Sequence, residues 1–383
     1  MQKIGVLIVN LGTPDDPSRG AVYRYLKEFL TDRRVIDIPW LPRNLLVRGI
    51  IAPFRSGSSA KLYQRLWTPE GSPLKIYGEE LAAGVQDHLG DPFVVELAMR
   101  YQSPSIKNGI ERLIEQNVSE IIVFPLFPQY ASATTGSVHD KVMEILRKKD
   151  SIPGVRMVNS YYDYEPMIEV FAQNAEQFDL HSYDHILFSY HGIPQRQLRK
   201  ADTNDHCLKA ENCCQNFGPH NQFCYSAQCH ATTRAIAKRL NLTADQYSTT
   251  FQSRLGPDPW TQPYTIKTIE HWAEKGAKRL LVFSPAFVSD CLETTIEIGF
   301  EYQEEFEEMG GEHIDLVPSL NGHPLWIKGV ADLIRQQVLP TPGQTFSTPV
   351  LPSRTDNAPL YAPGSNSGVS EKTAERERSE STS

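Results

Sequence analysis

The chain has 383 residues and a formal net charge of −8, and hydrophobic residues make up 40% of it. This composition is typical of a folded globular enzyme and excludes a wholly disordered chain. The acidic charge, with no Lys/Arg-rich block, excludes nucleic acid as the main partner, because binding phosphates needs clustered cations. No run of about 18 apolar residues predicts a membrane-spanning helix.

The N-terminal sequence MQKIGVLIVNLG predicts a β-strand and lacks the pattern of a signal peptide. We therefore expect a cytoplasmic location. The six cysteines are then not expected to form a disulfide framework, because the cytoplasm is reducing.

Short apolar runs that end in Gly or Pro alternate with amphipathic segments along the chain. The runs cover residues 5–12, 120–128, 185–192 and 279–287. Their length and β-branched residues are typical of buried parallel strands. Between them, the segments 73–89 and 262–276 place apolar residues at helical spacing. The pattern predicts an α/β fold.

A weak internal repeat favours two domains. LIVNLGTP (7–14) resembles LFSYHGIP (187–194), and residues 123–135 resemble residues 282–295. We expect two similar Rossmann-like domains with parallel sheets, over 1–155 and 156–338, and a cleft at the carboxyl ends of the strands. Residues 339–383, which are rich in Ser, Thr, Pro and charge, are expected to form a disordered tail.

Residues 35–55 are apolar but interrupted by prolines and arginines. Two interpretations stay open. The segment covers the core, or it forms an exposed lip that contacts a large apolar ligand or a bilayer surface.

Four carboxylates follow the last predicted strand at spacings of three, four and four: Asp290, Glu293, Glu297 and Glu301. These spacings place them on one helix face, where like charges repel one another. A solvated acidic face is the common explanation for such a row. The apolar neighbours and the position after a strand favour the alternative, a partly buried row that conducts protons or metal ions.

His191 ends a predicted strand and precedes Gly192. Parallel strand geometry is expected to aim His191 and Glu293 into one crevice. An imidazole facing a carboxylate can bind a divalent first-row metal or move protons near pH 7. Two ligands make an open, weak site, which suits passing a metal on rather than keeping it.

A series of motifs runs along the chain. In chain order they are VNLGTP (9–14), YRYLKEFLTDRRVIDIP (23–39), GSPL (71–74), MRY (99–101), PLFPQYASATTGS (125–137), FSYHGIP (188–194), TFQSRLGPDPWTQPYT (250–265), FVSDCLETTIEIGFEY (287–302) and SLNGHPLW (319–326). In these motifs and their order, the chain resembles ferrochelatase over about residues 3–338.

The resemblance implies insertion of Fe²⁺ into protoporphyrin IX to give protohaem, the last step of haem biosynthesis, with loss of two pyrrole protons. It implies a site histidine at His191, a metal- and proton-handling glutamate at Glu293, and an acidic path through Glu297 and Glu301. How His191 and Glu293 divide these roles stays open. The resemblance also places three residues around the macrocycle: Tyr130, Arg100 and Trp260. Cys291 stands where some relatives have histidine.

Five cysteines lie close together within an expected insertion at residues 200–229. They are Cys207, Cys213, Cys214, Cys224 and Cys229. Such density in a reducing compartment favours a metal site, and zinc and free thiols stay open as alternatives. Some bacterial ferrochelatases that the chain resembles carry a cysteine group here that binds a [2Fe–2S] cluster, which needs four ligands. The expected ligands are Cys207, Cys214, Cys224 and Cys229, with Cys213 as a substitute.

Two other classes of function stay open. One is a chelatase for another tetrapyrrole, such as coproporphyrin III or a sirohydrochlorin, and the other is a non-catalytic haem- or porphyrin-binding protein. A carrier would not need a charged exit row, so Glu293, Glu297 and Glu301 favour the enzyme. The lip at residues 35–55 further suggests peripheral contact with the inner face of a membrane, and the oligomeric state does not follow from the sequence.

Overall fold

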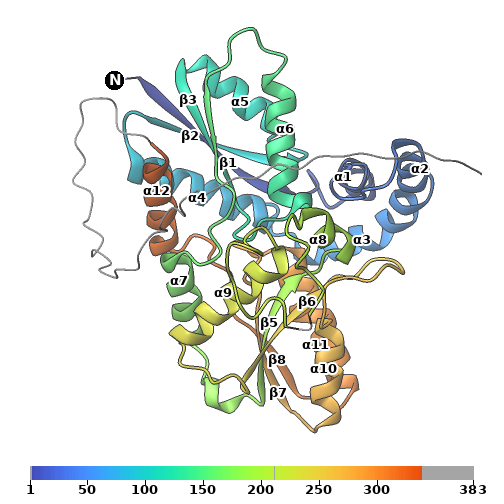
Figure 1. Ribbon diagram of the computed structural model, residues 1–383. Coiled ribbons are helices and arrows are strands. Elements are labelled where there is room, and N and C mark those ends of the chain that lie inside the picture. Colours follow the sequence, from blue (N-terminus) through green and yellow to red (C-terminus); the bar gives the residue numbers. More distant parts are fainter. Residues whose placement is uncertain (1, 211, 339–383) are drawn as a thin grey trace, which may run out of the picture. The chain divides into compact units, whose positions relative to one another are not determined.

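Two parallel four-stranded sheets form the centre of the computed structural model, which describes residues 2–210 and 212–338 (Figure 1). The first sheet has the order β2-β1-β3-β4, with β1 at Lys3–Gly12, β2 at Phe93–Tyr101, β3 at Val118–Pro125 and β4 at Gly154–Met157. The second has the order β6-β5-β7-β8, with β5 at His185–His191, β6 at Tyr247–Gln252, β7 at Arg279–Phe283 and β8 at His313–Leu316. The predicted α/β class with parallel sheets is confirmed. The predicted tail at 339–383 lies outside the described residues.

The four predicted apolar runs all contain strands, and they are the inner strands β1, β3, β5 and β7. Inner strands are covered on both faces, so their sequences are continuously apolar, and Val6–Val9 of β1 are fully buried. The four strands that the apolar pattern missed, β2, β4, β6 and β8, are the outer strands of the two sheets. Their sequences mix polar and apolar residues.

Helices flank both sheets. In the first half they are α1 (Arg19–Leu30), α2 (Trp40–Leu46), α3 (Ala52–Leu66), α4 (Pro73–Leu89), α5 (Ile106–Glu115) and α6 (Ser137–Leu146), with short π-helices η1 (Val47–Ile51) and η2 (Ser132–Gly136). The remainder are α7 (Glu165–Ala175), the 3₁₀ turn η3 (Leu180–Ser182), α8 (Gln195–Ala201), α9 (Tyr225–Arg239), α10 (Thr265–Glu274), the π-helix η4 (Leu292–Tyr302), α11 (Gln303–Glu308) and α12 (Pro324–Gln337). The predicted helix at 73–89 is α4, and the one at 262–276 contains α10.

The last described helix returns to the first half of the chain. Figure 1 shows α12 beside α4, and a Cβ added to Gly84 of α4 would lie 2.8 Å from the side chain of Ile327 in α12. One buried cluster also joins residues of both halves, including Phe124 of β3 and Phe188 of β5. The division into domains at residue 155 stays a prediction, because this core is continuous.

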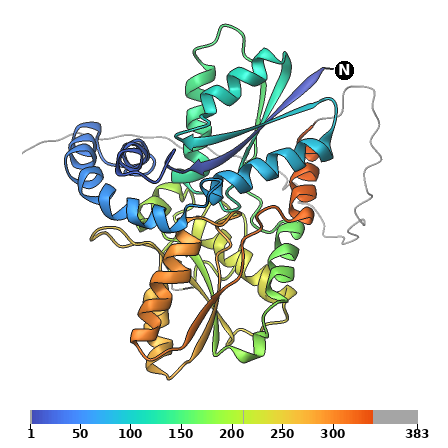
Figure 2. The ribbon, with the colours of Figure 1, turned by 180° about the vertical axis from the view of Figure 1, so that it is seen from behind.

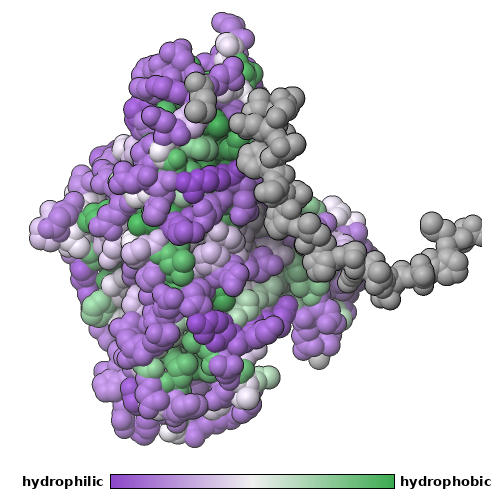
Figure 3. All heavy atoms as spheres, turned by 90° about the vertical axis from the view of Figure 1, so that its left-hand side faces the viewer, coloured by the Kyte–Doolittle hydropathy of each residue, from purple (hydrophilic) through white to green (hydrophobic). Residues whose placement is uncertain are grey.

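The segment 35–55 forms α2, η1 and the start of α3, which lie with α1 to one side of the sheets (Figure 2). Among the apolar residues of this segment, only Val47 and Ala52 are fully buried. Its exposed large apolar side chains are Trp40, Leu41, Leu45, Ile50 and Phe54, with Phe54 79% exposed. By contrast, the face drawn in Figure 3 is mostly hydrophilic, with hydrophobic side chains in small separate groups. We call the five exposed residues of the segment 35–55, Trp40, Leu41, Leu45, Ile50 and Phe54, the apolar face.

Candidate active site

His191 is the last residue of β5, at the carboxyl edge of the second sheet. Its Nδ1 lies 2.7 Å from the carbonyl oxygen of Gly192. A carbonyl only accepts, so this contact assigns the proton of the neutral ring to Nδ1 and its lone pair to Nε2. The imidazole therefore presents a basic nitrogen, which can take a proton or bind a metal ion.

Trp260 lies beside His191, with the two ring centroids 6.3 Å apart. The approach depends on Gly192, because a Cβ there would lie 2.9 Å from the backbone oxygen of Gln252 and 3.2 Å from the Trp260 ring. The indole N–H of Trp260 is buried and has no hydrogen-bond partner within the described part of the chain.

The acidic row lies on η4, and the structure keeps three of its four expected members. Glu293, Glu297 and Glu301 are spaced by four residues along this π-helix, a type of helix that is rare and often occurs at functional sites. Asp290 departs from the row, because its carboxylate accepts from Asn321 Nδ2 at 2.7 Å and from the backbone nitrogen of Ser319 at 3.3 Å. The expectation for Asp290 was wrong, because η4 begins at Leu292, so Asp290 does not share its helix face.

Gln252 joins the strand of His191 to the acidic row. It pairs with His191 in the ladder between β5 and β6. Its side-chain nitrogen donates to the backbone oxygen of Glu293 at 2.9 Å and to Glu297 Oε2 at 3.1 Å. The structure thus brings His191, Trp260, Glu293 and Glu297 to one edge of the second sheet.

Two tyrosines from the first half of the chain lie near enough to Glu293 to be affected by its charge. Tyr25 of α1 and Tyr63 of α3 are almost fully buried, and their rings meet edge to face at 6.3 Å. Burial raises the pKa of both phenols, and the negative charge of Glu293 raises them further. The pKa of the Cys291 thiol is raised by the same two causes. Glu293 therefore lies between the two halves, among neutral groups.

Glu301 lies at the solvent end of the row. Burial raises its pKa, and the nearby carboxylates Glu297 and Glu305 add to the shift. A groove of about 670 Å³ opens beside it, lined by Gly57, Ser58, Lys61, Leu62, Arg65 and Glu301. The row thus runs from the edge of β6 to an opening at the surface.

Arg100 is not brought to His191. Its side chain is largely buried at the edge of the first sheet, where it pairs with Asp32 Oδ2 at 2.6 Å and donates to Ser137 Oγ at 2.7 Å. Tyr101 also donates to Asp32, at 2.9 Å. Tyr130 is half-buried, and its backbone N–H donates to Gln228 Oε1 at 2.7 Å. Contact of these two residues with a substrate stays a prediction.

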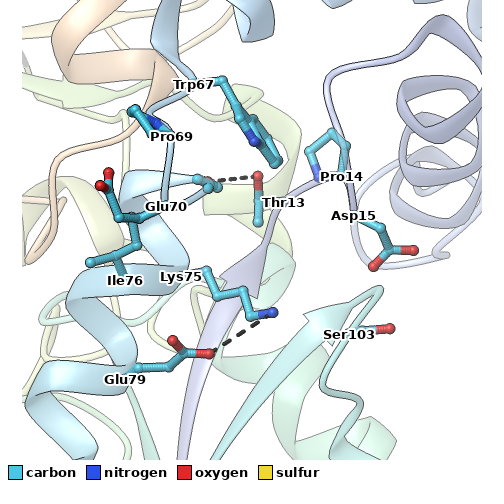
Figure 4. A pocket seen from close by; sticks show the side chains of 12 residues that line it. Thr13, Pro14, Asp15, Trp67, Pro69, Glu70, Lys75, Ile76, Glu79 and Ser103 are labelled. Carbon is cyan, nitrogen blue, oxygen red and sulfur yellow. Dashed lines mark hydrogen bonds and ion pairs between the residues drawn. The ribbon is translucent and has the colours of Figure 1, made fainter.

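A separate cavity of about 370 Å³ lies at the end of β1 (Figure 4). It is lined mainly by Thr13–Asp15, residues 67–72 and the first turns of α4. A hydrogen bond of 3.0 Å joins Thr13 and Ser72, and Lys75 pairs with Glu79 at 3.9 Å. Its charges are mixed, so it does not favour one class of ion.

The cysteine segment lies close to His191. The thiols of Cys213 and Cys214 are 3.8 Å apart, and a hydrogen bond with Cys224 lowers the pKa of Cys214. The Tyr225 hydroxyl, next to Cys224 in the chain, donates to the backbone oxygen of His191 at 2.8 Å. Across residues 2–210 and 212–338, no three His, Cys, Asp or Glu side chains are placed together to hold a metal ion.

Residues that the sequence left unassigned complete the site. Gln252 lies within the TFQSRLGPDPW motif, and Tyr25 lies within YRYLKEFL, but neither spacing nor charge marks them. Their roles become visible only when β6 and α1 are placed against η4.

Comparison with known proteins shows the family of this chain. Residues 3–338 match the family model described as Ferrochelatase. A ferrochelatase of Coxiella burnetii (strain Dugway 5J108-111) is 44% identical over 340 residues, which cover 88% of this chain and 94% of that protein. One of Legionella pneumophila (strain Paris) is 42% identical over 334 residues, covering 87% and 99%.

The chain belongs to the ferrochelatase family. Membership confirms the expected class of enzyme, one that inserts metal into a porphyrin in haem synthesis. Among solved structures, the sirohydrochlorin chelatase SirB from Bacillus subtilis subspecies spizizenii in complex with cobalt is 11% identical, with a TM-score of 0.48 over 87% of this chain and 94% of that chain.

Proposed function

We propose that this ferrochelatase inserts Fe²⁺ into protoporphyrin IX, with His191 as proton acceptor and the carboxylates of η4 handling the metal and protons. The observation that carries the proposal is that Gln252 pairs with His191 in the sheet and also donates hydrogen bonds to Glu293 and Glu297 of the acidic row. Two pyrrole protons must leave as Fe²⁺ enters, and the free Nε2 of His191 can accept one of them.

The acidic row supplies the second part of the chemistry. Glu293, Glu297 and Glu301 lead from the edge of β6 to the groove at Glu301, and among the described residues none of them forms an ion pair. Unpaired carboxylates attract a divalent cation, and oxygen ligands bind it weakly enough to release it. The row therefore suits Fe²⁺ delivery and proton removal.

An anaerobic assay tests the substrate. The purified chain is given Fe²⁺ with protoporphyrin IX or with coproporphyrin III, and products are separated by chromatography. We expect protohaem as the faster product. Faster formation of the coproporphyrin product would indicate that coproporphyrin III is the substrate. Haem binding without any metal insertion would favour a non-catalytic haem- or porphyrin-binding protein.

We further propose that the cysteine segment binds a [2Fe–2S] cluster. The support is the chemistry of the donors, because the thiols of Cys213 and Cys214 lie 3.8 Å apart and Cys224 lowers the pKa of the Cys214 thiol. Cys213 adjoins Cys214 and matches the expected substitute ligand. Cys229, the fourth expected ligand, is fully buried on α9, and burial raises the pKa of its thiol, so binding would have to deprotonate it.

Purification without oxygen tests the cluster. We expect a coloured protein with visible absorption and with iron and sulfide in equal amounts. Zinc alone would indicate a zinc site, and a colourless protein without metal would indicate free thiols.

We also propose that the apolar face rests on a membrane surface. Within the described residues no helix is long and apolar enough to cross a bilayer, so contact would be peripheral. Five large apolar side chains on α2, η1 and α3, with the exposed Arg48 among them and the exposed Arg55 directly after Phe54, suit an interface with anionic lipid. Co-sedimentation with anionic vesicles should fall when Trp40 and Phe54 are both changed to Ser. Equal binding by the double variant would contradict the proposal.

A further inference from the structure

Gln252 is a buried polar residue whose backbone and side chain both serve the site. It is 2% exposed at the end of β6. Its backbone oxygen accepts from the N–H of Gly192 at 2.9 Å, directly after His191. The residue next to the candidate base is therefore held by the main chain of Gln252.

The carboxamide of Gln252 has only one orientation that satisfies its neighbours. Its nitrogen faces two acceptors, the oxygens of Glu293 and Glu297, and its oxygen accepts from Ser189 Oγ at 2.7 Å. Rotating the amide by 180° would place its oxygen against a carbonyl and a carboxylate. The side chain is thus locked between β5, which carries Ser189 and His191, and η4.

The Glu297 carboxylate receives two more hydrogen bonds. Ser253 Oγ donates to Oε2 at 2.6 Å, and the hydroxyl of Tyr302 donates to Oε1 at 3.0 Å. Ser253 adopts a φ of 64°, a left-handed conformation that is uncommon for a residue other than Gly. Such backbone strain often occurs at functional sites. Here it turns the Ser253 hydroxyl toward Glu297.

We propose that Gln252 is a positioning residue, which holds the first turn of η4 at a constant distance from His191 during metal insertion. The inference rests on the proposed function. An imidazole and a carboxylate that act on one macrocycle must keep their spacing, and a displacement of about 1 Å can reduce a rate by about 10²-fold. One amide that bonds to both supporting elements meets this need without touching the substrate.

Gln252→Leu tests the proposal, because it keeps the approximate size and removes all three side-chain hydrogen bonds. We expect kcat for iron insertion to fall at least about tenfold, while KM for the porphyrin changes less than about twofold. Gln252→Glu is the second variant. It keeps an acceptor for Ser189 but replaces donation to Glu297 with repulsion, so it should also lower kcat.

Thr250→Val is the matched control. Thr250 lies two residues earlier on the same face of β6, is fully buried, and accepts a hydrogen bond from Thr265 at 3.0 Å. Val has the same shape, so this variant removes a buried hydroxyl whose link to Gln252 runs through Thr265 and Ser189. The hydrogen bonds from Gln252 to η4 remain in place. We expect its kcat to equal that of the wild type.

Crystal structures separate this inference from the proposed function. In Gln252→Leu we expect residues 293–297 to move relative to His191, a readout that requires no activity. An unmoved η4 would overturn the inference, as would a kcat no lower than that of Thr250→Val. A wild-type chain that inserts no metal would instead overturn the proposed function and leave the predicted displacement to be judged from the structures.

Discussion

The carboxyl edges of the two sheets have the same backbone plan but different chemistry. β1 and β2 end with Gly12 opposite Tyr101, and β5 and β6 end with His191 opposite Gln252. At the first edge, the buried charges of Arg100 and Asp32 are paired with each other. At the second edge, the carboxylate of Glu297 accepts hydrogen bonds from the neutral side chains of Gln252, Ser253 and Tyr302.

The comparison distinguishes charges that stabilise the fold from charges that are available for catalysis. A buried ion pair whose members satisfy each other stabilises only while both are present. A carboxylate without a cationic partner can attract a metal ion or a proton instead. We therefore expect changes at the first edge to affect stability and changes at the second edge to affect turnover.

The largest expected effect is on activity at the second edge. His191→Ala removes the free imidazole nitrogen and should lower iron insertion by about 10²–10⁴-fold, the usual contribution of a general base. Porphyrin binding, followed by visible absorption, should persist. The exposed His181→Ala serves as control, and near-normal haem formation by His191→Ala would refute the assignment.

At the first edge, Asp32→Ala should cost about 3–5 kcal/mol of unfolding free energy, because it leaves the charge of the buried Arg100 guanidinium without an anionic partner. Urea denaturation measures the loss. Only 6% of the Asp32 side chain and 12% of the Arg100 side chain are exposed, so water cannot compensate. A loss below about 1 kcal/mol would show that the two edges do not differ in this way.

Glu297→Gln should reduce turnover on the order of tenfold without loss of fold, because it removes one charge from the row and retains its shape. Steady-state kinetics and thermal unfolding measure the two quantities. Glu307→Gln, on the exposed side of α11, is the control. An unchanged rate would favour the alternative interpretation, in which the row is a solvated acidic face without a catalytic role.

Glu301→Gln should raise stability at neutral pH. The folded protein raises the pKa of Glu301 above its ordinary value of 4.5, so the ionised carboxyl destabilises the fold at a pH above the raised pKa. Below pH 4.5 the group is protonated in both states, and the advantage of Gln should vanish. Denaturation of both proteins at pH 7 and pH 4 measures this, and an equal difference at both values would contradict it.

The smallest effect is expected for Arg33→Ala, beside Asp32. Arg33 pairs with Asp140 at 3.0 Å, but 66% of its side chain is exposed. An exposed pair contributes about 0–1 kcal/mol, so urea denaturation should show almost no change. A loss as large as that of Asp32→Ala would show that burial is not the deciding difference.

Much of the candidate site could be predicted from local sequence. His191 ends an apolar run and precedes Gly192, and Glu293, Glu297 and Glu301 follow another run at fixed spacing. Asp290 was wrongly included, because its partners Ser319 and Asn321 are about 30 residues away in the chain and no local pattern reveals them.

The sequence by itself determined the inner strands, the α/β class, the strand-end histidine and the family, because hydrophobic periodicity and motif order are local properties of the chain. Only the tertiary structure decided which charges are paired, which apolar residues of 35–55 are exposed, and that Gln252 joins His191 to η4. These depend on contacts between distant segments, such as the 45 residues from Gln252 to Glu297. No periodicity encodes the distance between two strand ends.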